Sequence, residues 1–208
     1  MDQIKISLQK ARRGYELSAE GETYTILAYT AERYSLFSRE ETDAETLAEL
    51  LRFDEIERAK EQALRYLSLR DHFEAELLEK LRQKGYRREL CEEVLDFLRE
   101  QGLLDDERVA GAYAKVKLVS EGRNKVLYRL RQKGVAGSVA ESAIARADVD
   151  EVAVCEELLA RKWESLGSPE RMEEALERKL VNFLKNKGFG ISVILKTVKK
   201  LKNESFIR

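Results

Sequence analysis

Side chains that could catalyse a reaction are few in this sequence. The single histidine, His72, follows Asp71 at the predicted start of a helix, where a carboxylate caps free backbone N–H groups and a histidine is usually structural or merely exposed. Asp105 and Asp106 also lie at a predicted helix start, where the helix dipole favours acidic side chains. We therefore predict no catalytic residue and no metal site, and the sequence implies no cofactor.

A GFG sequence and two cysteines have simple structural interpretations. The GFG sequence at residues 188–190 lies between two predicted helices, so it indicates a helix end followed by a turn rather than a loop that holds phosphate. Cys91 and Cys155 lie in helical patterns with no neighbouring cysteine or histidine. Each is expected to be a small buried side chain, not half of a disulfide or a zinc ligand.

Basic side chains are the chemically useful residues that gather in the sequence. Residues 112–135 hold seven basic side chains and one acidic one, residues 171–208 hold ten and four, and residues 89–107 hold one and eight. Such charges can simply solvate the outer faces of helices. Alternatively, basic patches on successive helices can bind a polyanion or an acidic groove on a protein. The residues predicted to bind such a partner are Arg82, Lys84, Arg87, Arg88, Arg123, Lys125, Arg129, Arg131, Lys133, Lys185, Lys187, Lys199 and Lys200.

The aromatic residues at helical positions are expected to belong to the core or its boundary. They are Trp163, Tyr66, Tyr113 and Tyr128. Large aromatic side chains bury much apolar area and usually pack inside. Tyr128 leaves a second interpretation open, because beside Arg129 it could stack on a nucleobase.

The elements that position these residues are predicted to be mainly helical. Of the 208 residues, 43% are hydrophobic and 37% are charged, and 11 glycines and one proline leave little material for a disordered linker or a many-stranded sheet. No apolar run approaches the roughly 20 residues of a membrane helix. The first residues lack the apolar core of a secretion signal, so we expect a cytoplasmic protein with no membrane association.

The first 56 residues are predicted to form a β-rich subdomain with covering helices. Apolar and polar residues alternate in IKISLQ, YELSA and TYTILAY, which favours three short antiparallel strands. Residues 30–38 and the segment after Asp43 are the candidates to cover the sheet, with Asp43 capping the second of them.

One basic pentapeptide, LRQKG, occurs at residues 81–85 and again at 130–134, and LKNKG follows at 184–188. When the three glycines are aligned, apolar residues coincide four positions before them and five and ten positions after them. A period near 50 residues with matching apolar positions is typical of tandem helical repeats. We therefore expect each leucine to pack inward and each glycine to end a helix. The aligned apolar residues are Leu81, Leu130 and Leu184, then Leu90, Val139 and Val193, and then Leu95, Ile144 and Val198.

Nine helices are predicted after residue 56, in three sets of three. They cover about residues 57–69, 72–84, 88–101, 106–120, 123–133, 138–147, 150–166, 169–187 and 190–202. Ser168 and Pro169 mark the start of the eighth. The predicted fold is mainly α: an elongated, curved tandem array of three three-helix repeats behind a small β-rich subdomain. The subdomain covers residues 1–56, and repeats 1, 2 and 3 cover residues 57–105, 106–148 and 149–208.

Three segments, in this order and spacing, resemble the RecX family of bacterial regulatory proteins, which modulate the RecA recombinase. They are LRDHFEAELLEKLRQKGY (69–86), VLDFLREQGLLDDERVAGAYAKVKL (94–118) and GRNKVLYRLRQKGV (122–135). The segment IKISLQKARRGYELSAEGETYTI is similar to the β-rich N-terminal extension of RecX proteins from low-GC Gram-positive and related bacteria. Repeat 3 departs from the pattern, because its loop around SLGSPER is longer.

The resemblance implies a regulator of DNA repair, recombination and the SOS response that has no catalytic activity of its own. RecX proteins are curved helical arrays that lie in the groove of the RecA filament and inhibit ATP hydrolysis and strand exchange. The implied partners are therefore the RecA filament and DNA, single- or double-stranded, bound weakly or within the filament. The alternatives are a helical DNA-binding module that acts directly on nucleic acid, which the net charge of -1 and the pI of about 6.1 disfavour, and an adaptor for some other partner.

Overall fold

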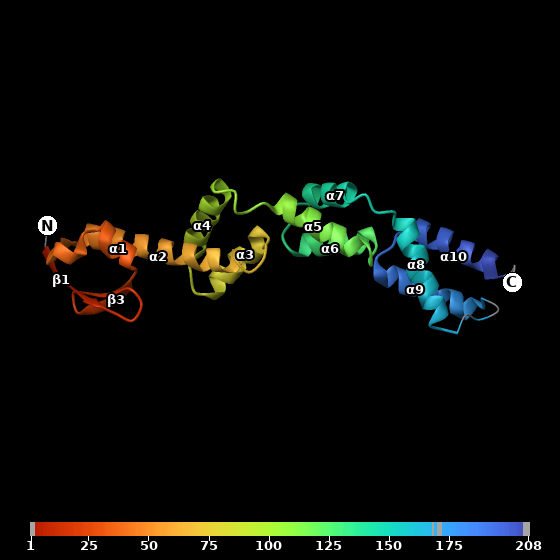
Figure 1. Ribbon diagram of the computed structural model, residues 1–208, viewed down its shortest axis with the longest axis horizontal. Coiled ribbons are helices and arrows are strands. Elements are labelled where there is room, and N and C mark those ends of the chain that lie inside the picture. The colour runs from red at the N-terminus through yellow and green to blue at the C-terminus, as the bar shows by residue number, and fades with distance from the viewer. Residues whose placement is uncertain (1–2, 168, 170–171, 206–208) are drawn as a thin grey trace. The chain divides into compact units, whose positions relative to one another are not determined.

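The computed structural model describes residues 3–167, 169 and 172–205, and it contains a small β-sheet followed by helices (Figure 1). The prediction of a mainly α fold with a β-rich N-terminal part is confirmed. Contacts divide the chain into two compact units, Met1–Arg70 with Leu77–Gln101 and Asp71–Glu76 with Gly102–Arg208. Each unit is described by itself. The division falls inside helix α3 (Glu74–Gln83).

The N-terminal sheet contains the strands β1 (Gln3–Lys10), β2 (Tyr15–Ala19), β3 (Glu22–Ile26) and β4 (Glu41–Asp43). Their order is β3-β2-β1-β4, and all neighbours are antiparallel. The sequence predicts only the first three strands, because the three residues of β4 are too few to show an alternating pattern. The inner face is covered by α1 (Ala28–Arg33), a short 3-10 helix (Leu36–Ser38) and the first turns of α2 (Ala44–Leu67).

Helix α2 is fixed at its start and again near its middle. Asp43 accepts a hydrogen bond from the Thr46 N–H at 2.8 Å, so the predicted cap is confirmed. Farther along, the buried Asp54 accepts bonds from the Leu27 N–H and the Thr30 hydroxyl, both at 2.7 Å, at the start of α1. No glycine or proline interrupts residues 44–67, so α2 continues through the boundary predicted between residues 56 and 57.

The other predicted helices are all present in the described chain. The eighth begins at Glu174 rather than at residue 169, and Ser168, its predicted cap, lies outside the described residues. The assignment of residues to three repeats stays a prediction, and the names repeat 1, 2 and 3 keep the predicted ranges below. The remaining helices are α4 (Arg88–Glu100), α5 (Asp106–Leu118), α6 (Arg123–Gln132), α7 (Gly137–Arg146), α8 (Glu151–Glu164), α9 (Glu174–Lys187) and α10 (Ile191–Ser205).

The repeated pentapeptides form the same helix end three times. Gly85, Gly134 and Gly188 adopt φ values of 95°, 83° and 89°, a left-handed conformation that glycine adopts without strain. In each case the residue after the glycine donates its N–H to the leucine carbonyl five positions earlier, and the glycine N–H donates to the residue after that leucine, which is the Schellman arrangement. The first of these bonds are Tyr86 to Leu81 at 3.4 Å, Val135 to Leu130 at 3.1 Å and Phe189 to Leu184 at 3.2 Å.

Two separate apolar cores lie in the second unit. One is formed by α5, α6 and α7 with Phe73, and the other by α8, α9 and α10. The three aligned leucines are fully buried, as predicted. Cys91 and Cys155 are buried free thiols, also as predicted, and burial raises the pKa of each.

Carboxylates at the starts of α5 and α8 cap the second helix of the preceding repeat. Asp106 accepts the Glu74 N–H at the start of α3, and Glu151 accepts the Arg123 N–H at the start of α6, both at 2.9 Å. The sequence assigns Asp106 to the dipole of its own helix, but Asp106 and Glu151 each also satisfy a free N–H group of a neighbouring helix. Burial raises the pKa of Asp106. The same type of contact recurs at two successive junctions.

Candidate partner-binding surface

The second helices of the three repeats, α3, α6 and α9, carry most of the predicted binding residues. Each contains two buried residues four positions apart, so the residue midway between them points to the opposite side of the helix. We call this residue the outward position. The outward face consists of this residue and the residues three and four positions before and after it, which surround it on the helix surface. The outward positions are Glu79 in α3, Tyr128 in α6 and Asn182 in α9, each six residues before the glycine that ends its helix.

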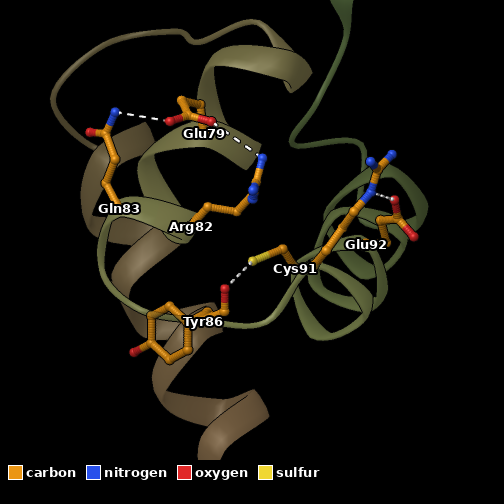
Figure 2. Close-up of polar contacts among 7 residues, drawn as sticks. Glu79, Arg82, Gln83, Tyr86, Cys91 and Glu92 are labelled. Carbon is orange, nitrogen blue, oxygen red and sulfur yellow. Dashed lines mark hydrogen bonds and ion pairs between the residues drawn. The ribbon is translucent and has the colours of Figure 1, made fainter.

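In α3, acidic residues neutralise the outward face. Figure 2 shows Glu79 between Arg82 and Gln83, and its carboxylate lies 3.7 Å from the Arg82 guanidinium and accepts a 3.1 Å hydrogen bond from Gln83. Glu76 adds a second acidic residue to this face. Lys84, at the end of the helix, is exposed. The first LRQKG pentapeptide therefore offers little unbalanced positive charge.

The two predicted residues that follow α3 are also paired. Arg87 lies 3.9 Å from Glu55 of α2, and the Arg88 Nε donates to Glu92 at 2.8 Å, a contact that raises the pKa of Arg88. Close by, the Cys91 thiol donates to the Tyr86 carbonyl at 3.8 Å (Figure 2). Arg87 and Arg88 thus lie at the α3–α4 turn, in contact with acidic residues of the same unit.

In α6, the outward face contains no acidic residue. Tyr128, which lies at the centre of this face, is 62% exposed. The expectation that it belongs to the core or its boundary is therefore wrong. Its neighbours two positions away in either direction, Val126 and Leu130, are buried and turn Tyr128 outward. The same expectation is correct for Trp163, which is buried, and for Tyr66 and Tyr113, which are half-buried. The other members of the face are Asn124, Lys125, Arg131 and Gln132.

The basic residues of α6 make ion pairs within the chain. Glu121, whose side chain is only 13% exposed, lies 3.1 Å from Arg129 and 3.7 Å from Lys125. Arg123 lies 3.5 Å from Glu151, and Arg131 lies 3.1 Å from Glu141. The Arg131 pair is exposed on both sides, and pairs of this kind contribute about 0–1 kcal/mol and are screened by salt. An external anion can therefore compete for Arg131.

Lys133 and Lys187 lie against aromatic rings of their own unit. The Lys133 ammonium is 5.6 Å from the Phe73 ring and 5.8 Å from the Tyr113 ring, while that of Lys187 is 5.9 Å from the Phe183 ring. These distances are within the range of cation–π attraction. Both lysines are half-buried, so they hold the helix end in place and are less accessible than the sequence suggests.

In α9, the outward face is the most basic of the three. Arg178, Lys179, Lys185 and Asn186 surround Asn182, and Lys179 and Lys185 are exposed without an ion pair among the described residues. The sequence predicts Lys185 but misses Lys179, although the position of Lys179, three residues before Asn182, identifies it once the outward positions are aligned. Of the two predicted residues in α10, Lys199 is exposed, and Lys200 donates to Glu156 at 2.6 Å.

The end of α9 contacts the start of α6 and joins their outward faces. The Gly122 N–H donates to the Lys187 carbonyl at 2.9 Å, and the Asn124 N–H donates to the Gly188 carbonyl at 3.2 Å. The Lys125 ammonium donates to the Asn186 carbonyl at 3.2 Å. Because Lys125 and Asn186 belong to the two outward faces, these faces meet at this contact, and we call the two faces together the α6–α9 strip.

Comparisons with known proteins identify the family. The chain is 32% identical over 166 residues to the regulatory protein RecX of Clostridium perfringens (strain 13 / Type A), which covers 79% of this chain and 78% of the relative. The chain belongs to the RecX family. The family model of the RecX first three-helix domain matches residues 59–98 of this RecX-family chain. The regulatory protein RecX of Chlorobium limicola (strain DSM 245) is 39% identical over 143 residues, 67% of this chain and 86% of the relative.

Two solved structures share the RecX fold of this chain. A crystal structure of regulatory protein RecX superposes with a TM-score of 0.72 at 24% identity, over 95% of this chain and 99% of the other. The crystal structure of RecX from Lactobacillus salivarius has a TM-score of 0.62 at 21% identity, over 71% and 97%. Within the part of the chain that the structure describes, no helix is both long and apolar enough to cross a membrane, and no group of three or more potential metal ligands occurs.

Proposed function

We propose that the chain binds the RecA–DNA filament in the cytoplasm and reduces ATP hydrolysis and strand exchange by the recombinase, without catalysing a reaction itself. In this role the protein would regulate DNA repair and recombination during the SOS response. Membership of a family whose curated relatives are named regulatory proteins supports a regulatory role.

The observation that carries the proposal is the α6–α9 strip, in which no outward position is occupied by an acidic residue. A filament presents acidic and phosphate groups at regular intervals, so a binder with cations on successive repeats can make several weak contacts at once. Lys125, Arg131, Lys179 and Lys185 occupy the same two positions on the outward faces of α6 and α9. The whole chain has a net charge of only -1, so its total charge does not indicate an anionic partner. The local basic surface does.

Co-sedimentation with recombinase tests this function. The protein is centrifuged with RecA alone, with DNA alone and with RecA filaments assembled on single-stranded DNA. We expect it in the pellet with filaments in much larger amount than with either component. Equal recovery with DNA alone would favour the alternative, a helical module that acts directly on nucleic acid, and absence from all pellets would contradict both.

A further inference from the structure

The outward position distinguishes α6 from α3. In α3 this position is Glu79, with Glu76 on the same face, whereas in α6 it is Tyr128 and the helix contains no acidic residue. A carboxylate at the centre of a face repels a phosphate, whereas an exposed ring can stack on any base. The difference between Glu79 and Tyr128 therefore changes what each face can bind, although both helices end in the same LRQKG pentapeptide.

The four neighbours of Tyr128 can all donate hydrogen bonds. Arg131 can make charge-assisted bonds to phosphate oxygens, and the amides of Asn124 and Gln132 can bond to phosphates, sugars or base edges. Lys125 adds a positive charge, although its ammonium already donates to the Asn186 carbonyl. Two cations and two amides around one exposed ring match a nucleotide, which presents a flat base beside an anionic backbone. A groove on an acidic protein would require the cations but not the ring.

Helix α9 extends this arrangement in the same unit. Its outward face repeats the pattern with Arg178, Lys179, Lys185 and Asn186 around Asn182, and the bond from Lys125 to the Asn186 carbonyl joins the two faces. At 1.5 Å per residue, helices of 10 and 14 residues are about 15 and 21 Å long. The strip is therefore long enough to follow several nucleotides of a single strand.

We propose that the α6–α9 strip binds single-stranded nucleic acid, with Tyr128 stacked on a base and the exposed Arg131, Lys179 and Lys185 in contact with phosphates. This inference rests on the proposed function and deepens it, because it assigns a nucleic-acid contact to one surface of a filament-binding protein. It also assigns no such contact to α3, where Glu79 occupies the position of the ring.

The test measures binding of a fluorescein-labelled oligothymidylate to the full-length protein by fluorescence anisotropy. Tyr128→Ala should weaken binding by about 5- to 150-fold, the loss expected for one stacked base, while Tyr128→Phe should stay within about twofold of the unmodified protein because the ring remains. Tyr128→Glu, which introduces the charge present in α3, should weaken binding at least as much as Tyr128→Ala. Tyr29→Ala is the matched control, because Tyr29 is a similarly exposed tyrosine, at 54%, in the other unit, and it should leave binding unchanged.

A salt titration tests the phosphate contacts. Replacing Lys179 and Lys185 together by glutamine should reduce the slope of log affinity against log salt concentration by about 1.4, since each phosphate contact on a single strand contributes about 0.7. All of these substitutions lie at exposed positions, and circular dichroism verifies that each variant is folded.

Measuring inhibition of the RecA filament ATPase with the same variants separates this inference from the proposed function. Failure of the unmodified protein to bind oligothymidylate, or unchanged binding by Tyr128→Ala, would overturn the inference. Loss of ATPase inhibition by Tyr128→Ala with unchanged oligothymidylate affinity would show that the strip contacts protein instead. Binding that depends on Tyr128, without any inhibition by the unmodified protein, would support the inference and contradict the proposed function.

Discussion

Gly188 lies at the contact between α9 and α6, and its replacement by alanine should destabilise repeat 3 strongly. Its φ of 89° is a conformation that costs an alanine about 1–2 kcal/mol. An added Cβ would also lie 2.2 Å from the Lys125 Cβ and 2.7 Å from the Lys125 backbone nitrogen, so the two helix ends would have to separate. Separation weakens the bonds from Gly122 and Asn124, each worth about 1 kcal/mol. The expected total loss in the free energy of unfolding is therefore about 3–4 kcal/mol.

Gly167 provides the matched control for this substitution. Its φ is 85°, close to that of Gly188, but among the described residues no atom beyond its chain neighbours lies within 4 Å of an added Cβ. Gly167→Ala should therefore cost only the conformational part, about 1–2 kcal/mol. The fluorescence of Trp163, which is buried in the core of α8, α9 and α10, reports urea unfolding of both variants. Equal losses in the two variants would refute the claim that the close contact between α9 and α6 stabilises the structure.

Two further predictions concern the repeated contacts. Because burial raises the folded-state pKa of Asp106 above its usual value near 4, the stability that its titration contributes is fully present below about pH 4 and is lost as pH rises through the higher folded-state value. At pH 7, Asp106→Asn keeps the acceptor for the Glu74 N–H without a half-buried charge, so it should be at least as stable as the unmodified protein. Asp106→Ala removes the acceptor and should lose about 1 kcal/mol in urea unfolding. A less stable Asp106→Asn would contradict this account. Leu130→Ala removes a fully buried side chain of the repeated pentapeptide and should lower the free energy of unfolding by about 2–5 kcal/mol in the same assay, and a loss below about 1 kcal/mol would contradict its core position.

The helical repeat could be predicted because its signals are local. A leucine that packs inward and a glycine that ends the helix occupy fixed positions in LRQKG, and the structure confirms both roles at Leu130 and Gly134. The cap at Asp43 is equally local, since the side chain bonds to an N–H three residues later. The strand β4 escapes prediction because three residues have no readable period, and pairing with β1 rather than sequence pattern defines it.

The candidate surface could be predicted only in part, because exposure and pairing depend on residues that are distant in sequence. The cations in and just after α6 lie close together in the sequence, which suggests that all of them are equally accessible to a partner. In the structure, however, Lys133 packs against the ring of Phe73, sixty positions earlier. The usual burial of aromatic residues predicts Tyr128 in the core, yet the buried residues two positions away on either side of it turn it outward. The contrast between Glu79 and Tyr128 is already visible in the sequence when the residues six positions before Gly85 and Gly134 are compared.

The most direct test of the proposed function compares two double charge reversals in an assay of ATP hydrolysis by RecA filaments on single-stranded DNA. Lys179→Glu with Lys185→Glu alters the α6–α9 strip, and Arg82→Glu with Lys84→Glu alters α3, whose outward face already contains Glu76 and Glu79. We expect the unmodified protein to inhibit hydrolysis, the α9 variant to need a several-fold higher concentration for the same inhibition, and the α3 variant to resemble the unmodified protein. Equal inhibition by the α9 variant and the unmodified protein would contradict the claim that the α6–α9 strip binds the filament.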